Sequence, residues 1–113
     1  MVAESLSRLM TACGMVPVMV KKDLHGFLAN RLQHALSREA FYLIDEGIAT
    51  PEDVDKAVRF GFGFRFLAAG PVMQRDHAGL EVHTAAAASM YPSLAVNAEP
   101  ARVLQERVAR GDL

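Results

Sequence analysis

The sequence has 113 residues, a formal net charge of -1 at pH 7 and a hydrophobic fraction of 51%. This length is enough for one domain with a hydrophobic core and excludes a second complete domain. Basic and acidic residues nearly balance, which argues against a nucleic-acid partner, because binding to a phosphate backbone needs a basic excess. The single cysteine, Cys13, excludes an intramolecular disulfide framework.

No apolar run reaches the roughly 18 residues that a membrane span needs, and no basic N-terminal region precedes an apolar core as in a signal peptide. We therefore expect a cytoplasmic protein without a membrane partner.

The first predicted elements are a helix at residues 3–13, ended by Gly14, and a short strand at residues 16–20. Pro17 limits that strand to a sheet edge. A single strand has no pairing partner within this chain, so we interpret this part as the tail of another domain. Pairing with a second copy would satisfy the strand. The apolar helix positions are Leu6, Leu9, Met10 and Cys13.

A run of about twenty residues without Gly or Pro, from Phe27 to Glu46, predicts a long central helix that ends at Gly47. One face is apolar and is expected to be buried. Glu39 falls within it, where we expect an ion pair with Arg31 or Arg65. The apolar positions are Leu28, Leu32, Ala35, Leu36, Ala40 and Leu43.

The other side of this helix carries Asn30, His34, Ser37 and Phe41 at i, i+4, i+7 and i+11. This stripe is either a solvated face or the lining of a pocket. The Asn30 side chain can donate to and accept from a bound carbonyl or hydroxyl group. The alternative is an Asn that faces solvent or caps the helix start.

The next helix begins at Thr50, with Pro51 at its first position and acidic residues after it. It is expected to end in a tight turn at residues 61–66, where phenylalanines fill the core and glycines allow close backbone approach. A dinucleotide-binding loop is rejected, because Phe66 stands where a third glycine would be and a helix precedes.

Three further helices are predicted at residues 72–77, 80–90 and 101–110. Asp76 is expected to cap or brace the second of them. In the last, Glu106 is expected to pair with Arg102 and Arg110. The predicted fold class is all-α, with about five helices around one long central helix, preceded by a short helix-strand unit.

Chemical motifs are sparse. The four histidines (His25, His34, His77 and His83) have no zinc-ligand spacing, and no nucleophile elbow is present. The residues by themselves indicate no catalytic constellation and no metal site.

Several short motifs nevertheless occur in a characteristic order. They are Lys21-Lys22-Asp23, Gly26-Phe27-Leu28-Ala29-Asn30-Arg31-Leu32, Glu39-Ala40, Glu46-Gly47, Glu52-Asp53-Val54-Asp55, Gly61-Phe62-Gly63, Gly70-Pro71 with Asp76, and Gly79-Leu80. In combination, and over most of the chain, they resemble the C-terminal domain of the NAD-dependent 3-hydroxyacyl-CoA dehydrogenases.

This resemblance implies that residues 1–24 are the terminal helix-strand remnant of an NAD-binding Rossmann domain. Residues 25–113 would be the helical C-terminal substrate and dimerisation domain. In that family the catalytic His, its Glu partner and the glycine-rich NAD loop lie in the preceding domain. No catalytic, cofactor-binding or metal residue is therefore expected in this chain.

The family's G-F-x-x-N-R motif supplies an Asn that helps to hold the substrate, and this role carries over to Asn30. His34, Ser37 and Phe41 are substrate-binding candidates by spacing alone. The Pro that often precedes the Gly-Phe pair is replaced by His25.

The implied full-length enzyme oxidises the 3-hydroxyl of 3-hydroxyacyl-CoA with NAD, in fatty acid metabolism, as a homodimer joined through the helical domain. This chain alone is expected to be inactive and to bind no NAD. Two alternatives stay open. One is the same domain in a related dehydrogenase of the carnitine or gulonate type, and the other is a non-catalytic helical association module.

Overall fold

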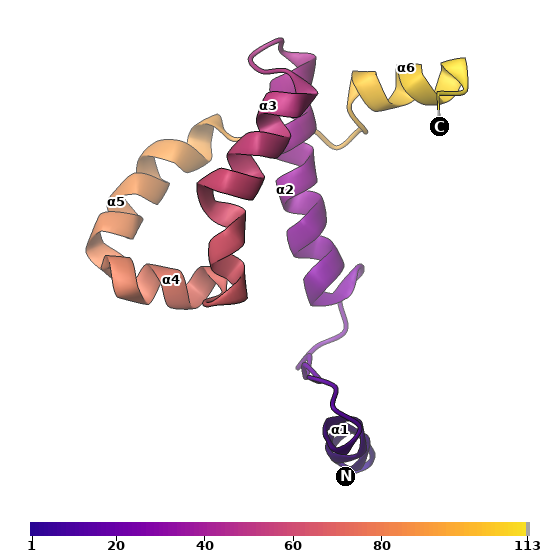
Figure 1. Cartoon of the computed structure of the whole chain (residues 1–113), viewed down its shortest axis with the longest axis vertical. Helices are drawn as coiled ribbons and strands as arrows, with labels where there is room; N and C mark the ends of the chain where they lie inside the picture. Colours follow the sequence, from indigo (N-terminus) through magenta and orange to yellow (C-terminus); the bar gives the residue numbers. More distant parts are fainter. Residues whose placement is uncertain (113) are drawn as a thin grey trace. The chain divides into compact units, whose positions relative to one another are not determined.

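The computed structural model describes residues 1–112, and within them the regular structure is entirely helical (Figure 1). The predicted all-α class is confirmed. The chain divides into two units, Met1–Gln33 and His34–Leu113, which we describe separately. The helices are α1 (Val2–Ala12), α2 (Phe27–Asp45), α3 (Pro51–Lys56), the π-helix η1 (Ala57–Phe62), the 3-10 helix η2 (Gly63–Leu67), α4 (Pro71–Ala78), α5 (Leu80–Met90), the 3-10 helix η3 (Tyr91–Ser93) and α6 (Arg102–Arg110).

In the first unit, α1 ends where the sequence predicts, with the Cys13 N–H donating to the Leu9 carbonyl at 3.1 Å. The strand predicted at residues 16–20 is wrong for this chain, since residues 15–20 form no ladder. The reason is physical: a strand needs a neighbour for its main-chain groups, and the described residues supply none.

A tight turn leads into α2. The Phe27 N–H donates to the Leu24 carbonyl at 2.9 Å, and Gly26 has φ +80°, as the third position of a type II turn requires. Phe27 follows at φ +49°, the one positive φ of a non-glycine residue within 1–112. The Arg31 guanidinium donates to the His25 carbonyl at 3.3 Å, which ties the turn to the first turn of the helix.

The second unit contains the rest of α2 and all later helices. After α2, the Thr50 side chain caps α3 as predicted: its Oγ1 accepts from the Asp53 N–H at 3.2 Å, and its hydroxyl donates to an Asp53 carboxylate oxygen at 2.9 Å. Two reciprocal bonds with acidic residues in the first turn explain why so short a helix begins sharply here.

The turn predicted at residues 61–66 is instead helical, because α3 continues into η1 and then η2. The close approach predicted for the glycines does occur: a Cβ on Gly63 would lie 2.7 Å from the Val58 carbonyl oxygen. The phenylalanines of this segment do not fill a core, since Phe62, Phe64 and Phe66 are 36%, 58% and 45% exposed. That part of the prediction is wrong, because in the described chain no element covers them.

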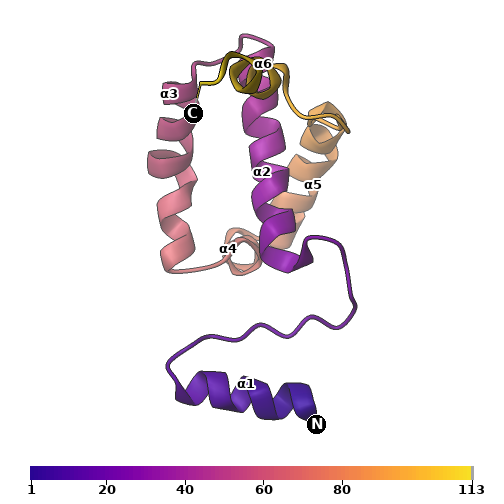
Figure 2. The same cartoon turned by 90° about the vertical axis from the view of Figure 1, so that its right-hand side faces the viewer.

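Figure 2 shows α4 and α5 following this segment, and α5 ends in η3. The Gln74 side chain donates to the Ala69 carbonyl at 2.6 Å, which secures the start of α4. Asp76 does not cap α5, whose N-cap residue, Gly79, has no side-chain bond. The positive φ of Gly79, +94°, makes the corner by itself.

Two carboxylates of α2 hold the C-terminal segment of the second unit. Glu39 accepts the Ala95 N–H at 2.7 Å. Asp45 accepts the N–H groups of Arg102 and Val103 at 2.6 and 2.9 Å, which caps α6. The ion pair predicted for Glu39 with Arg31 or Arg65 is therefore wrong among the described residues, because a backbone amide satisfies its carboxylate.

The ion pairs predicted inside α6 are also replaced. The Arg102 guanidinium lies 3.9 Å from the Asp45 carboxylate and 3.8 Å from that of Glu46, and Arg110 pairs with Asp112 at 3.0 Å. Both arginines sit at helix ends, where acceptors from outside the helix compete with an i+4 partner.

Apolar surface is largely open. Within residues 1–112 the one buried hydrophobic residue is Ala95, at 6% exposure. Leu28, Leu32 and Leu36, predicted to face a core, are exposed, while residues 39–45 of α2 are half-buried. The half-buried part of α2 is thus the part that contains Glu39 and Asp45, the two residues that bind the C-terminal segment. The apolar face of α2 was predicted to be covered along its whole length, and this prediction is wrong for the N-terminal half of the helix.

Candidate functional site

Asn30, the predicted substrate contact, lies in the first turn of α2 and belongs to the first unit. Its side chain is exposed and makes no hydrogen bond to another residue among 1–112. The Gly26-Phe27 turn fixes where the helix begins and therefore where Asn30 stands on it. An amide side chain that is free to donate and to accept is suited to a hydroxyl or carbonyl oxygen.

The other stripe residues lie further along α2, in the second unit. His34 is exposed, whereas Ser37 and Phe41 are half-buried. Neither His34 nor Ser37 has a side-chain hydrogen bond within the described chain. These three residues share one face of α2 because of their helical spacing, and no contact between their side chains brings them into a site. We describe no site that joins them to Asn30.

No group of three or more His, Cys, Asp or Glu side chains among residues 1–112 is placed to hold a metal ion. In the same part of the chain, no helix combines the length and apolar character of a membrane-crossing segment.

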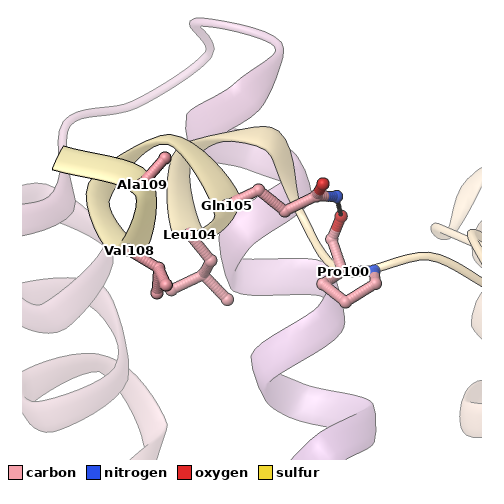
Figure 3. Close-up of a pocket in the computed structure, with 5 residues that line it drawn as sticks. All are labelled: Pro100, Leu104, Gln105, Val108 and Ala109. Atoms are coloured by element: carbon pink, nitrogen blue, oxygen red, sulfur yellow. Dashed lines mark hydrogen bonds between the residues drawn. The ribbon is translucent and has the colours of Figure 1, made fainter. Parts of the chain in front are cut away.

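An open hollow of about 400 Å³ lies along one side of α6 (Figure 3). Its one polar side chain, Gln105, donates to the Pro100 carbonyl at 2.7 Å and is thereby occupied. The hollow contains none of the predicted site residues and offers no titratable group. The lining residues are Pro100, Leu104, Gln105, Val108 and Ala109.

Sequence reasoning missed the two structural carboxylates, Glu39 and Asp45, as backbone acceptors. One signal was present: α6 begins after Ala101, which has no side-chain acceptor, so its cap has to come from elsewhere in the chain. The carboxylate that supplies the cap comes from a residue more than fifty positions away in the sequence. Helical periodicity cannot predict such a contact.

Comparison with solved structures finds a close fold match. The chain aligns with the crystal structure of 5-formyl-3-hydroxy-2-methylpyridine 4-carboxylic acid 5-dehydrogenase, described as an NAD+-dependent dismutase, with a TM-score of 0.92 and 32% identity. The alignment covers 96% of this chain and 35% of that one.

Curated proteins give a consistent picture. The 5-formyl-3-hydroxy-2-methylpyridine 4-carboxylate 5-dehydrogenase of Mesorhizobium japonicum is 35% identical over 101 residues, which is 89% of this chain and 33% of the relative. An L-carnitine dehydrogenase of Oceanobacillus iheyensis is 48% identical over 65 residues, or 58% of this chain and 21% of the relative. The chain thus spans a third or less of the length of these relatives.

The family model for the C-terminal domain of 3-hydroxyacyl-CoA dehydrogenase matches residues 26–113. The match begins at the Gly-Phe turn and includes Asn30, the aromatic stretch after α3 and every later helix. The resemblance predicted from the ordered motifs is confirmed, and the chain belongs to the family of 3-hydroxyacyl-CoA dehydrogenase C-terminal domains.

Proposed function

We propose that this chain is the substrate-side and dimerisation domain of an NAD-dependent dehydrogenase. The observation that carries the proposal is the fold match over 96% of the chain to an NAD+-dependent enzyme. The sequence contains no G-x-G-x-x-G motif on a strand-to-helix turn, so in this proposal NAD is held by a preceding domain and not by these residues.

For the substrate we propose a small hydroxy compound that carries a carboxylate. Two relatives support this choice, since one is named for a pyridine carboxylate and the other for L-carnitine. The second candidate is a 3-hydroxyacyl-CoA, which the description of the family model favours. The two candidate substrates differ in size and in the position of the negative charge, so a comparison of their kcat/KM values distinguishes them.

Asn30 is proposed to orient the oxygen of the substrate that is oxidised. Hydride transfer needs a bound nicotinamide, a base for the hydroxyl proton and a group that fixes the oxygen. Asn30 offers the third of these, through the N–H of its side-chain amide, and its exposure leaves that group uncommitted. His34, Ser37 and Phe41, which belong to the second unit, stay substrate-binding candidates by helical spacing alone.

Dimerisation through the helical domain rests on exposed area. Along α2 the side chains of Leu28, Leu32 and Leu36 are 45%, 63% and 41% exposed. Obligate dimer interfaces bury apolar side chains of this kind. The open apolar faces, including Leu28, Leu32 and Leu36, therefore have room for a second copy and for a further domain.

The decisive test begins with the reading frame that encodes this chain, which we expect to continue upstream into a G-x-G-x-x-G unit. The product of that frame should reduce NAD with a small 3-hydroxy acid at a higher kcat/KM than with 3-hydroxybutyryl-CoA. Asn30→Ala should lower kcat/KM by about 100-fold, in the range for one lost stabilising donor. Gln33→Ala, which removes an exposed amide from the same helix, is the matched control and should act within about twofold of wild type.

Turnover without any effect of Asn30→Ala would remove the role of Asn30 but keep the dehydrogenase. Absence of NAD reduction with every hydroxy acid and acyl-CoA, together with a stable dimer, would instead support the association module. Sedimentation of the 113-residue chain gives the oligomeric state directly, and a monomer at about 100 μM, well above the Kd of obligate dimers, would contradict the dimerisation proposal.

A further inference from the structure

The start of α2 differs from the start of every other α-helix in residues 1–112. Each of the other five α-helices begins with a hydrogen bond from the N–H of its fourth residue to the carbonyl of the residue before the helix. In α4, for example, the Gln74 N–H donates to the Gly70 carbonyl at 3.0 Å. The corresponding pair in α2 is Asn30 and Gly26, and no such bond joins these two residues, both of which the structure describes. The first turn of α2 therefore needs another contact to fix it.

Two successive left-handed residues explain the missing bond. Gly26 has φ +80° and Phe27 has φ +49°, whereas an α-helix needs negative φ at each of its residues. Phe27 is strained there, because a residue with a Cβ disfavours positive φ, and such strain persists only where neighbouring contacts hold it. The bond from the Phe27 N–H to the Leu24 carbonyl closes the turn itself but does not tie it to the helix that follows.

Arg31 makes the contact that ties the turn to the helix. Its Nη1 group donates to the His25 carbonyl at 3.3 Å, across six positions of the sequence. Its stem lies beside Gly26: a Cβ on that glycine would lie 3.3 Å from the Arg31 Cγ and 3.9 Å from the Asn30 Cβ. The turn, the Arg31 side chain and the base of the Asn30 side chain are therefore packed together, and all three belong to the first unit.

The position of Arg31 is unfavourable for the helix alone. The N-terminus of an α-helix carries a partial positive charge, and α2 has no acidic residue in its first turn to offset that charge. A cation so close to this end gains nothing from the helix dipole. Its bond to the His25 carbonyl explains an arginine here better than helix stability does.

We propose that Arg31 is a positioning residue, which holds the side-chain amide of Asn30 in the orientation that the oxidised oxygen of the substrate requires. This role rests on the proposed function of Asn30. Arg31 does not touch the substrate in this proposal and acts through the turn and the first turn of α2. Rates are sensitive to such a contact, because a displacement of about 1 Å can cost as much as about 100-fold.

The first test measures NAD reduction by variants of the longer product of the reading frame. Arg31→Met keeps an unbranched apolar stem beside Gly26 and removes the donor, so we expect kcat to fall about tenfold with KM within about twofold of wild type. Arg31→Lys can still donate to the His25 carbonyl and should recover most of the loss. Arg38→Met removes an exposed arginine from the same helix. It is the matched control and should stay within about twofold.

A double-mutant cycle separates positioning from a merely structural role. In the Asn30→Ala background no amide is left to be positioned, so the addition of Arg31→Met should lower kcat/KM by less than about twofold. A further loss of about tenfold would mean that Arg31 acts independently of Asn30 and would overturn the proposal. The proposal is also overturned if Arg31→Lys is as impaired as Arg31→Met, or if Arg38→Met loses as much.

The second test uses the 113-residue chain and needs no NAD. Hydrogen exchange at the Phe27 amide reports opening of the turn, and Arg31→Met should accelerate it by at least about fivefold, with Arg31→Lys near wild type. Exchange within about twofold of wild type in Arg31→Met would overturn the positioning role even in an active dehydrogenase. Accelerated exchange together with a longer product that reduces no NAD would instead overturn the proposed function, and would leave Arg31 as the residue that holds the turn.

Discussion

Removal of the Asp45 carboxylate should open the N-terminus of α6. Asp45 is 12% exposed and accepts two backbone N–H groups, from Arg102 at 2.6 Å and from Val103 at 2.9 Å. A bond to a charged acceptor contributes about 1.5 kcal/mol at the low end, and a lost helix cap costs about 0.5–2 kcal/mol. The ion pair with Arg102 adds little, since that side chain is 69% exposed.

For Asp45→Ala we therefore expect the local free energy of opening at α6 to fall by about 2 kcal/mol, because two donors lose their acceptor. Hydrogen exchange at the amides of Arg102 and Val103 measures this directly. A loss of 2 kcal/mol corresponds to an increase in their exchange rates of about 30-fold. Asp45→Asn keeps one carbonyl oxygen and should show about half of the free-energy change.

Glu46→Ala is the matched control, because Glu46 is the neighbouring carboxylate, is 51% exposed and approaches Arg102 only at 3.8 Å. It should change the opening free energy by less than about 0.5 kcal/mol. Exchange at Arg102 and Val103 within twofold of wild type in Asp45→Ala would refute the capping role, as would an equal effect of Glu46→Ala.

Three further changes probe single contacts. Gly63→Ala places a Cβ 2.7 Å from a carbonyl oxygen and should destabilise the chain by about 2 kcal/mol in thermal unfolding followed by circular dichroism; Gly61→Ala meets nothing within 4 Å and should not lower the midpoint. Glu39→Ala should raise amide exchange at Ala95 by a factor that corresponds to about 1–2 kcal/mol, while Glu39→Gln, which keeps an acceptor, should recover most of it. Because Phe27 has φ +49°, Phe27→Gly should retain the helicity of α2, and Phe27→Val should lose at least about 1 kcal/mol relative to it in urea unfolding; equal stabilities would contradict strain at this residue.

The helix boundaries could be predicted because their signals are local. Thr50 caps α3 with its own side chain, Gly47 follows the end of α2, and Gly111 ends α6 in the left-handed conformation. Each depends on atoms within a few residues, so residue type and position suffice. The family could be predicted for the same reason, since its motifs are short and ordered.

What failed depends on contacts between distant residues or on surfaces that this chain leaves open. The partner of Glu39 lies 56 residues away, at Ala95, and no periodic pattern specifies it. The phenylalanines of residues 61–66 have the composition of a core segment, yet Phe64 and Phe66 are exposed. Apolar spacing identifies a face that is to be covered but does not say whether the same chain covers it.

The two halves of α2 have different tasks in this structure. Its C-terminal half, residues 39–45, is half-buried and holds the segment from Ala95 to α6 through two carboxylates. Its N-terminal half is exposed and carries Asn30 after a strained turn at Phe27. Two hydrogen bonds fix the backbone at this strained position: the Phe27 N–H donates to the Leu24 carbonyl at 2.9 Å, and the Arg31 guanidinium donates to the His25 carbonyl at 3.3 Å. In the proposed function, the exposed start of α2 that this turn fixes is where Asn30 meets the substrate.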